Sequence, residues 1–140
     1  MTRYLALRSL AVAALLGTCF AAPAGDSLPF HGSGIEKITG GGPGFLVTDG
    51  EGVATHLGHF TRHLLVFIDG DTLDGDLVIT AANGDELWIH LDGAFSTLSG
   101  TYTITGGTGR FSDASGSAEF SAAFISADTA EFSFDGTISY

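Results

Sequence analysis

Three histidines occur close together in the chain, and three histidines can hold a transition metal. They are His56, His59 and His63. On an extended strand His59 and His63 share a face but lie about 13 Å apart, which is too far for one ion. His56 and His59 point to opposite faces unless Gly58 forms a bulge. We therefore predict exposed strand histidines and no metal site. His90 is predicted to be a packed or rim histidine and not a catalytic base.

Four carboxylates lie between Asp69 and Asp76 and could bind Ca²⁺ through oxygen ligands. The segment fails as an EF-hand loop, because its glycine comes one position late and Thr80 stands where a bidentate glutamate is needed. Aspartate and glycine are also the residues that hairpin turns select. We expect a solvated turn, and calcium binding is the alternative.

The glycine-rich segment Gly106–Gly109 resembles a phosphate-binding loop, but no helical pattern follows it. We interpret it as a tight corner that needs positive φ. The chain has no Gly-x-Ser-x-Gly motif, and its one cysteine, Cys19, lies near the start. We therefore assign no catalytic residue and expect no cofactor.

The remaining candidate site is an apolar pocket formed by aromatic side chains at alternating strand positions, with an arginine as a possible anchor for an anion. Alternating aromatic residues also fit a filled core, so both interpretations stay open. The predicted lining residues are Tyr102, Arg110, Phe120, Phe124, Phe132, Phe134 and Tyr140.

The elements that would position these residues are strands, because apolar residues alternate at period two and Gly, Asn and Asp interrupt them. Asn83–Gly84 predicts a two-residue hairpin turn, which pairs Thr80 with Leu87 and Leu77 with His90. Eight antiparallel strands without a covering helix must close, so we predict an all-β, up-and-down barrel. The predicted strands are Phe30–Ile38, Phe45–Ala54, Thr55–Asp69, Leu77–Ala82, Glu86–Asp92, Gly100–Thr105, Ser117–Ser126 and Ala130–Tyr140.

The first 24 residues have the parts of a secretory signal peptide. Arg3 and Arg8 precede the apolar stretch 10–20, and Ala22 and Ala24 are small residues before a cleavage point. The apolar stretch is too short to span a bilayer. We predict one mature domain, residues 25–140, that is secreted or periplasmic, with lipidation at Cys19 as a minor alternative.

The formal net charge of the whole chain is −11, which disfavours nucleic acid and anionic membrane surfaces as partners. No later stretch is long and apolar enough for a transmembrane segment. The segment Leu64–Ile68 is apolar on both faces of its strand. If the protein forms a homo-oligomer, we expect this segment to be the subunit contact.

Three segments carry a resemblance to a known group: Ala54–Thr61, Thr80–Leu87 and Ile104–Gly116. They resemble small exported bacterial proteins of unassigned function, whose barrel is similar to that of allene oxide cyclase and the plant dirigent proteins. The resemblance implies a calycin-like eight-stranded barrel. It implies no activity, because the acidic, tyrosine and arginine residues of those families have no matching positions here.

Two functions from different classes follow. The first is an exported, non-catalytic barrel that binds a small apolar ligand or an envelope component. The second is an isomerase or cyclase that acts on a hydrophobic substrate inside the barrel and is similar in kind to allene oxide cyclase. A pocket holding a titratable residue with a perturbed pKa would favour the second. A purely structural role in the envelope is a third option.

Overall fold

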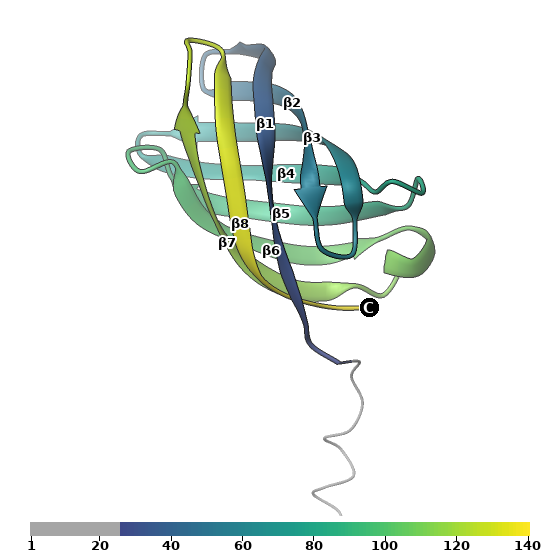
Figure 1. Cartoon of the computed structure of the whole chain (residues 1–140). Helices are drawn as coiled ribbons and strands as arrows, with labels where there is room; N and C mark the ends of the chain where they lie inside the picture. Colours follow the sequence, from purple (N-terminus) through teal and green to yellow (C-terminus); the bar gives the residue numbers. More distant parts are fainter. Residues whose placement is uncertain (1–25) are drawn as a thin grey trace, which may run out of the picture.

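The computed structural model describes residues 26–140, and the predicted signal peptide and Cys19 lie outside these residues. Each strand pairs in antiparallel fashion with the next one along the chain, and β1 pairs with β8 to close the barrel (Figure 1). The predicted all-β, eight-stranded up-and-down barrel is therefore confirmed. The strands are β1 (Leu28–Gly42), β2 (Phe45–Ala54), β3 (Gly58–Asp69), β4 (Thr72–Thr80), β5 (Glu86–Ala94), β6 (Ser99–Gly107), β7 (Ser115–Phe124) and β8 (Thr129–Ser139).

Several strand boundaries differ from the prediction, and β1 extends to Gly42, into the predicted glycine loop. The first residues of β3 and β4 differ for local reasons. β3 begins at Gly58 and not at Thr55, because His56 and Gly58 have φ values of 65° and 68° and form a turn. β4 begins at Thr72, so that only the tip of the predicted acidic turn is a turn. Asp74 and Asp76 therefore lie on a strand.

The predicted pairing of β4 with β5 is wrong by one residue. Ala81 donates its N–H to the carbonyl of Asp85 at 2.8 Å, and Gly84, with φ 94°, closes a longer turn than two residues. Leu77 consequently pairs with Ile89, and His90 pairs with Asp76. A one-residue slip changes the face of every side chain, so His90 belongs to the outer surface.

Glycines at inward positions make room for aromatic rings in the barrel interior. A Cβ added to Gly34 on β1 would lie 2.7 Å from Cζ of Phe132, and one added to Gly52 on β2 would lie 2.9 Å from Cζ of Phe60. These distances are shorter than any ordinary van der Waals contact, so the rings occupy the space that side chains would otherwise take. A glycine on one strand therefore leaves the space that an aromatic ring of the neighbouring strand fills.

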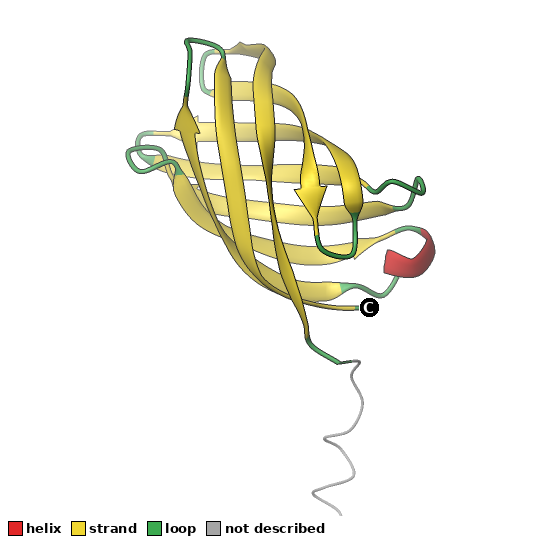
Figure 2. Cartoon of the chain, viewed as in Figure 1, coloured by secondary structure: helices red, strands yellow, loops and turns green. Residues whose placement is uncertain are grey.

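The two ends of the barrel differ. At one end, which we call the plugged end, the short 3₁₀ helix η2 (Gly109–Phe111) lies in the β6–β7 connection (Figure 2). The side chains of Phe111, Leu57 and Ile138 are fully or almost fully buried there. The β1–β2, β3–β4, β5–β6 and β7–β8 turns form the opposite end, which we call the open end. Within residues 26–140, no helix has the length and hydropathy needed to cross a membrane.

Candidate binding cavity

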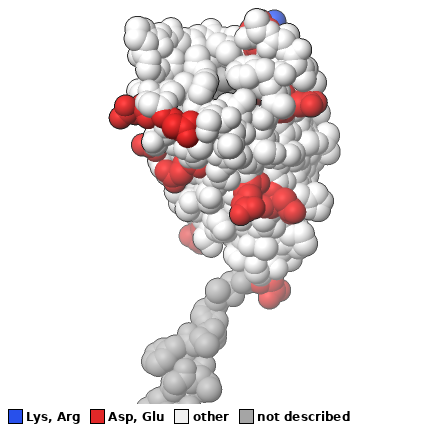
Figure 3. Space-filling view, turned by 90° about the vertical axis from the view of Figure 1, so that its left-hand side faces the viewer, with Lys and Arg blue, Asp and Glu red and all other residues white. Residues whose placement is uncertain are grey.

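A cavity of about 70 Å³ lies inside the open end of the barrel. Its walls are mostly apolar, with the aliphatic Leu64, Val66 and Leu91 beside several aromatic side chains. At its mouth lie Phe95 and Phe124, whose exposed fractions are 41% and 47%. Figure 3 views the molecule from the left of Figure 1, where loops of this end gather, and shows mostly uncharged atoms with acidic groups spread among them. The cavity is thus apolar and reaches the surface.

The inner end of the cavity is polar, and we call its four residues, Glu36, Thr48, Arg62 and Tyr102, the polar floor. They come from β1, β2, β3 and β6. The Nη2 of Arg62 lies 3.0 Å from Oε2 of Glu36, and Nη1 donates a hydrogen bond of 3.0 Å to the hydroxyl oxygen of Tyr102. The hydroxyl of Thr48 donates to the same Oε2 at 2.9 Å. One ion pair and two hydrogen bonds thus connect three neighbouring strands, β1, β2 and β3, with β6.

Burial sets the chemistry of the polar floor. The side chain of Arg62 is 1% exposed and that of Glu36 is 12% exposed. A charged side chain buried this far is tolerated only when it is paired, because removing an ion from water costs on the order of several kcal/mol. The Nε–H of Arg62 is nevertheless buried without a hydrogen-bond partner among the described residues. One strong donor of a residue that lines the cavity is therefore unsatisfied among the described residues.

Aromatic rings hold the two donors in place. The ring of Tyr102 stacks on Phe120 with a centroid distance of 4.7 Å, and the guanidinium of Arg62 lies 4.2 Å above the ring of Phe132. Burial raises the pKa of Tyr102, and the nearby Arg62 only partly offsets this effect. The phenol therefore stays protonated and can donate a hydrogen bond at neutral pH.

The structure brings four of the predicted pocket residues together: Tyr102, Phe120, Phe124 and Phe132 line the cavity. Phe134 lies deeper, against Phe30, Phe60 and Tyr102. The other two residues, Arg110 and Tyr140, are placed differently from the prediction. β6 and β8 both end at the plugged end, so the residues that follow them lie far from the cavity.

Sequence reasoning missed Arg62, Glu36 and Thr48. Arg62 lies between Phe60 and Leu64 in the inward series of β3. The alternation of apolar residues therefore indicates that Arg62 points inward. A cation at an inward position must be paired or functional. The position of Glu36 in β1 carries the same signal, but the flanking glycines weaken the pattern there.

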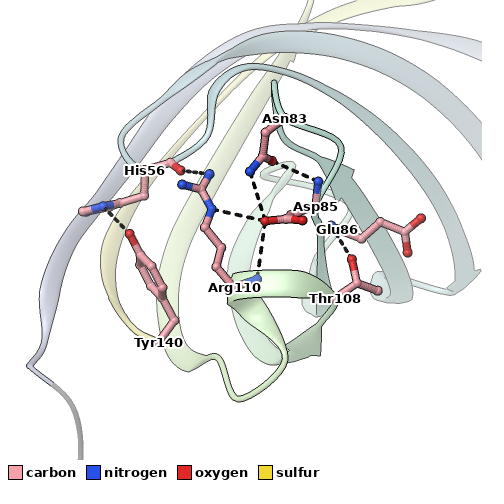
Figure 4. A network of polar contacts seen from close by, with 7 residues as sticks. All are labelled: His56, Asn83, Asp85, Glu86, Thr108, Arg110 and Tyr140. Carbon is pink, nitrogen blue, oxygen red and sulfur yellow. Dashed lines mark hydrogen bonds and ion pairs between the residues drawn. The ribbon is translucent and has the colours of Figure 1, made fainter.

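Arg110 and Tyr140 belong to a hydrogen-bonded network at the plugged end (Figure 4). Arg110 donates from Nη2 to the carbonyl of His56 at 2.6 Å, and its Nε lies 3.6 Å from Oδ2 of Asp85. His56 donates from Nε2 to the carbonyl of Pro29 at 2.9 Å, so its Nδ1 accepts from the Tyr140 hydroxyl at 3.0 Å. These groups satisfy one another and tie three loops to the C-terminus.

His90 lies on the outer surface among three aspartates. Its Nε2 is 2.9 Å from Oδ1 of Asp74 and 3.4 Å from Oδ1 of Asp92, and its Nδ1 is 3.2 Å from Oδ1 of Asp76. The hydrogen bond with Asp76 raises the pKa of His90, and the charges of Asp92 and Asp74 add to this effect. Ligand atoms of Asp74, His90 and Asp92 lie within 4.8 Å of one another, an arrangement that the ion pairs themselves explain.

The other acidic and histidine candidates are dispersed over the surface. Asp71 accepts hydrogen bonds from the N–H and the hydroxyl of Ser96 at 2.6 and 3.0 Å, and so fastens the β3–β4 turn to the β5–β6 turn. His59 and His63 are exposed, as predicted, and pair with Glu51 at 3.9 Å and Asp49 at 2.7 Å. Asp71 therefore bonds to Ser96, whereas Asp74 and Asp76 share His90.

Comparison with known proteins gives a fold and no family. No protein-family model and no curated protein matches the chain. Among solved structures, a pterocarpan synthase dirigent protein superposes with a TM-score of 0.62 at 14% identity, covering 85% of this chain and 98% of that one. A second pterocarpan synthase dirigent protein gives 0.57 at 16% identity, covering 84% and 89%. A pyocyanin demethylase gives 0.48 at 14% identity, covering 78% and 99%. The two dirigent superpositions show that the barrel has a dirigent-like fold.

Proposed function

We propose that this protein is an exported, non-catalytic β-barrel that binds a small apolar molecule in the cavity of the open end. One observation carries the proposal: an apolar cavity with an unsatisfied buried donor opens at one end of the barrel. Eight strands enclose an interior that side chains can fill, and at the plugged end Phe111, Leu57 and Ile138 are fully or almost fully buried. The unfilled space at the open end is the feature expected of a ligand site.

The polar floor supports binding over a purely structural role. Hydrophobic residues of similar volume often stabilise an interior as well as a buried ion pair does, or better. A buried Glu36–Arg62 pair is therefore weak as a stabilising device. It fits a site in which a few polar groups orient a mostly apolar ligand.

The size of the cavity limits how much of a ligand is enclosed. A benzene-sized cavity engineered in another protein has a volume of about 150 Å³, and the cavity here is about half of that. A ligand larger than a few atoms must therefore extend through the mouth. The exposed rings of Phe95 and Phe124 provide apolar contacts at that point.

A fluorescence titration with N-phenyl-1-naphthylamine, a neutral apolar dye, tests the proposal. Emission should rise and shift to the blue when the dye enters the cavity. Ala122 lines the cavity, whereas the next residue, Ala123, faces solvent, so the chain offers a matched pair. Ala122→Trp should abolish the rise, and Ala123→Trp should preserve it. If the wild type gives no rise, ligand binding is rejected and a structural role is favoured.

An isomerase or cyclase is the second candidate, and the polar floor is the observation that favours it. Tyr102 is a protonated phenol of raised pKa in a pocket, hydrogen-bonded to Arg62, and could polarise a substrate oxygen. The buried carboxylate, Glu36, is already engaged at Oε2 by the ion pair with Arg62 and the hydrogen bond from Thr48. Chemical change of a bound molecule, followed by mass spectrometry and chiral chromatography, would favour catalysis over binding alone.

Export is part of the proposal and rests on the sequence of residues 1–24. Intact-mass measurement of the protein from the medium or periplasm of its host should give a chain that begins at Gly25. A chain that begins at Cys19 with added lipid would instead show membrane anchoring. A full-length chain in the cytoplasm would contradict export.

Self-association through the Leu64–Ile68 segment stays a prediction. Leu65 and Phe67 point outward and are 36% and 56% exposed, and the ring of Phe67 lies 6.3 Å from that of Phe45. If this surface is a subunit contact, Phe67→Glu should lower the molar mass measured by light scattering. A wild type of monomer mass would remove the idea.

A further inference from the structure

We propose that the cavity selects neutral, carbonyl-containing apolar molecules over carboxylic acids, with the carbonyl oxygen bound by Tyr102 and Arg62 and with Glu36 as the residue that excludes anions. This inference rests on the proposed function, since it assumes that the cavity binds a ligand. It names the chemical class of that ligand and the residue that sets the preference.

The charge of the polar floor is balanced before any ligand arrives. Arg62 is the only cation among the described residues that line the cavity, and Glu36 pairs with it at 3.0 Å. The other lining anion, Asp128 at the mouth, has Lys37 at 3.8 Å. A carboxylate ligand would bring an uncompensated negative charge into a site of low dielectric, where an unpaired charge is costly.

Hydrogen-bond donors are nevertheless in excess. The hydroxyl of Tyr102 accepts from Arg62, and its own hydrogen has no acceptor within residues 26–140. The Nε–H of Arg62 also has none. Two donors without acceptors and no spare positive charge match a neutral oxygen with two lone pairs, such as that of a ketone.

The Glu36 side chain adds a repulsive element. Oε2 makes both polar contacts of this carboxylate, the ion pair with Arg62 and the hydrogen bond from Thr48. Oε1 accepts no hydrogen bond from the described residues, so it is free to face an incoming group. A carboxylate ligand would meet this oxygen as a like charge, whereas a ketone brings no charge.

Two probes of the same shape separate these cases. 2-Nonanone and octanoate carry the same heptyl chain on a carbonyl carbon, and differ in bearing a methyl group or a charged oxygen. Their dissociation constants can be measured near neutral pH by displacement of bound N-phenyl-1-naphthylamine. The wild type should bind 2-nonanone at least about tenfold more tightly than octanoate, which corresponds to one unpaired charge or hydrogen bond.

Substitutions assign the preference to residues. Glu36→Gln keeps the shape but leaves the Arg62 charge free, so octanoate should gain at least about tenfold and the preference should fall or reverse. Tyr102→Phe removes one donor and should weaken 2-nonanone about tenfold while the dye binds as before. If Glu36→Gln does not fold, Tyr102→Phe still tests the inference, because the Tyr102 substitution leaves the Glu36–Arg62 ion pair intact.

The outcomes distinguish this inference from the proposed function. If the dye does not bind the wild type, the proposed function itself fails. If the dye binds but octanoate binds as tightly as 2-nonanone, or neither displaces it, the inference fails and the binding function stands. Unchanged affinity for 2-nonanone in Tyr102→Phe would also overturn it.

Discussion

At the scale of single residues, Arg62 defines the character of the barrel interior. It is one of the few polar residues among the inward positions, and its three neighbours in the polar floor are arranged around its guanidinium. Its ring contact with Phe132 and its ion pair with Glu36 fix the orientation of the side chain. The same contacts leave Nε without a hydrogen-bond partner among the described residues.

Replacement of Arg62 by methionine should destabilise the protein by about 3 kcal/mol, because Glu36 would remain buried and unpaired. Urea unfolding followed by circular dichroism measures this loss. The double variant Glu36→Gln with Arg62→Met removes both charges and should recover at least about 1 kcal/mol of it. Equal losses in the single and double variants would show that the ion pair is not the cause.

His90 should make stability depend on pH. Its pKa is raised above the ordinary value of 6.5, chiefly by the hydrogen bond with Asp76. The charged ring stabilises the fold below that value, and the stabilisation is lost as pH rises through the raised pKa. Both ring nitrogens face carboxylate oxygens, which accept only, so the full set of contacts needs the doubly protonated ring.

His90→Gln should therefore lower the free energy of unfolding near pH 6 by up to about 1 kcal/mol and leave it unchanged near pH 9. His59→Gln is the control, since His59 meets a single carboxylate at 3.9 Å. A loss that is the same at both pH values would exclude the ion pairs as its origin.

At the scale of elements, alternation was enough to predict the strands and their order in the barrel, but not the register of β4 with β5. β7 and β8 alternate cleanly and match the prediction within two residues at each end. The β4–β5 register was missed because Asn83–Gly84 has the sequence of a two-residue turn, yet Asp85 extends it by accepting from Asn83 and Arg110. A contact with a residue far along the chain thus overrode the local signal.

Gly34→Ala tests how glycine positions shape the interior. The added methyl group would lie 2.7 Å from Cζ of Phe132 and from Cα of Gly52, so rings and backbone must shift. We expect a loss of about 1 to 3 kcal/mol in the free energy of unfolding. Ser33→Ala is the matched control, because Ser33 points outward on the same strand, and it should change stability by less than about 0.5 kcal/mol. Equal effects would show that the interior is loosely packed.

At the scale of the whole molecule, the barrel combines a filled end with an open one. Phe111 of η2 and the network of Figure 4 close the plugged end, while the turns of the open end leave a cavity. Closure of the barrel could be predicted, because unpaired edges are unfavourable. The sequence did not predict which end stays open, because that depends on where η2 and the C-terminus pack. The aromatic residues could be assigned to the interior, but their division between the two ends could not.

The central claim is that ligands bind at the open end and contact the polar floor. The most direct test is a titration of the isotope-labelled protein with 2-nonanone, followed by the amide signals in NMR spectra. The account predicts shifts concentrated at Thr48, Arg62, Tyr102 and Ala122, with the signals of Phe111 and Ile138 unchanged. Shifts confined to the outer face around Phe67, or to the plugged end, would contradict it.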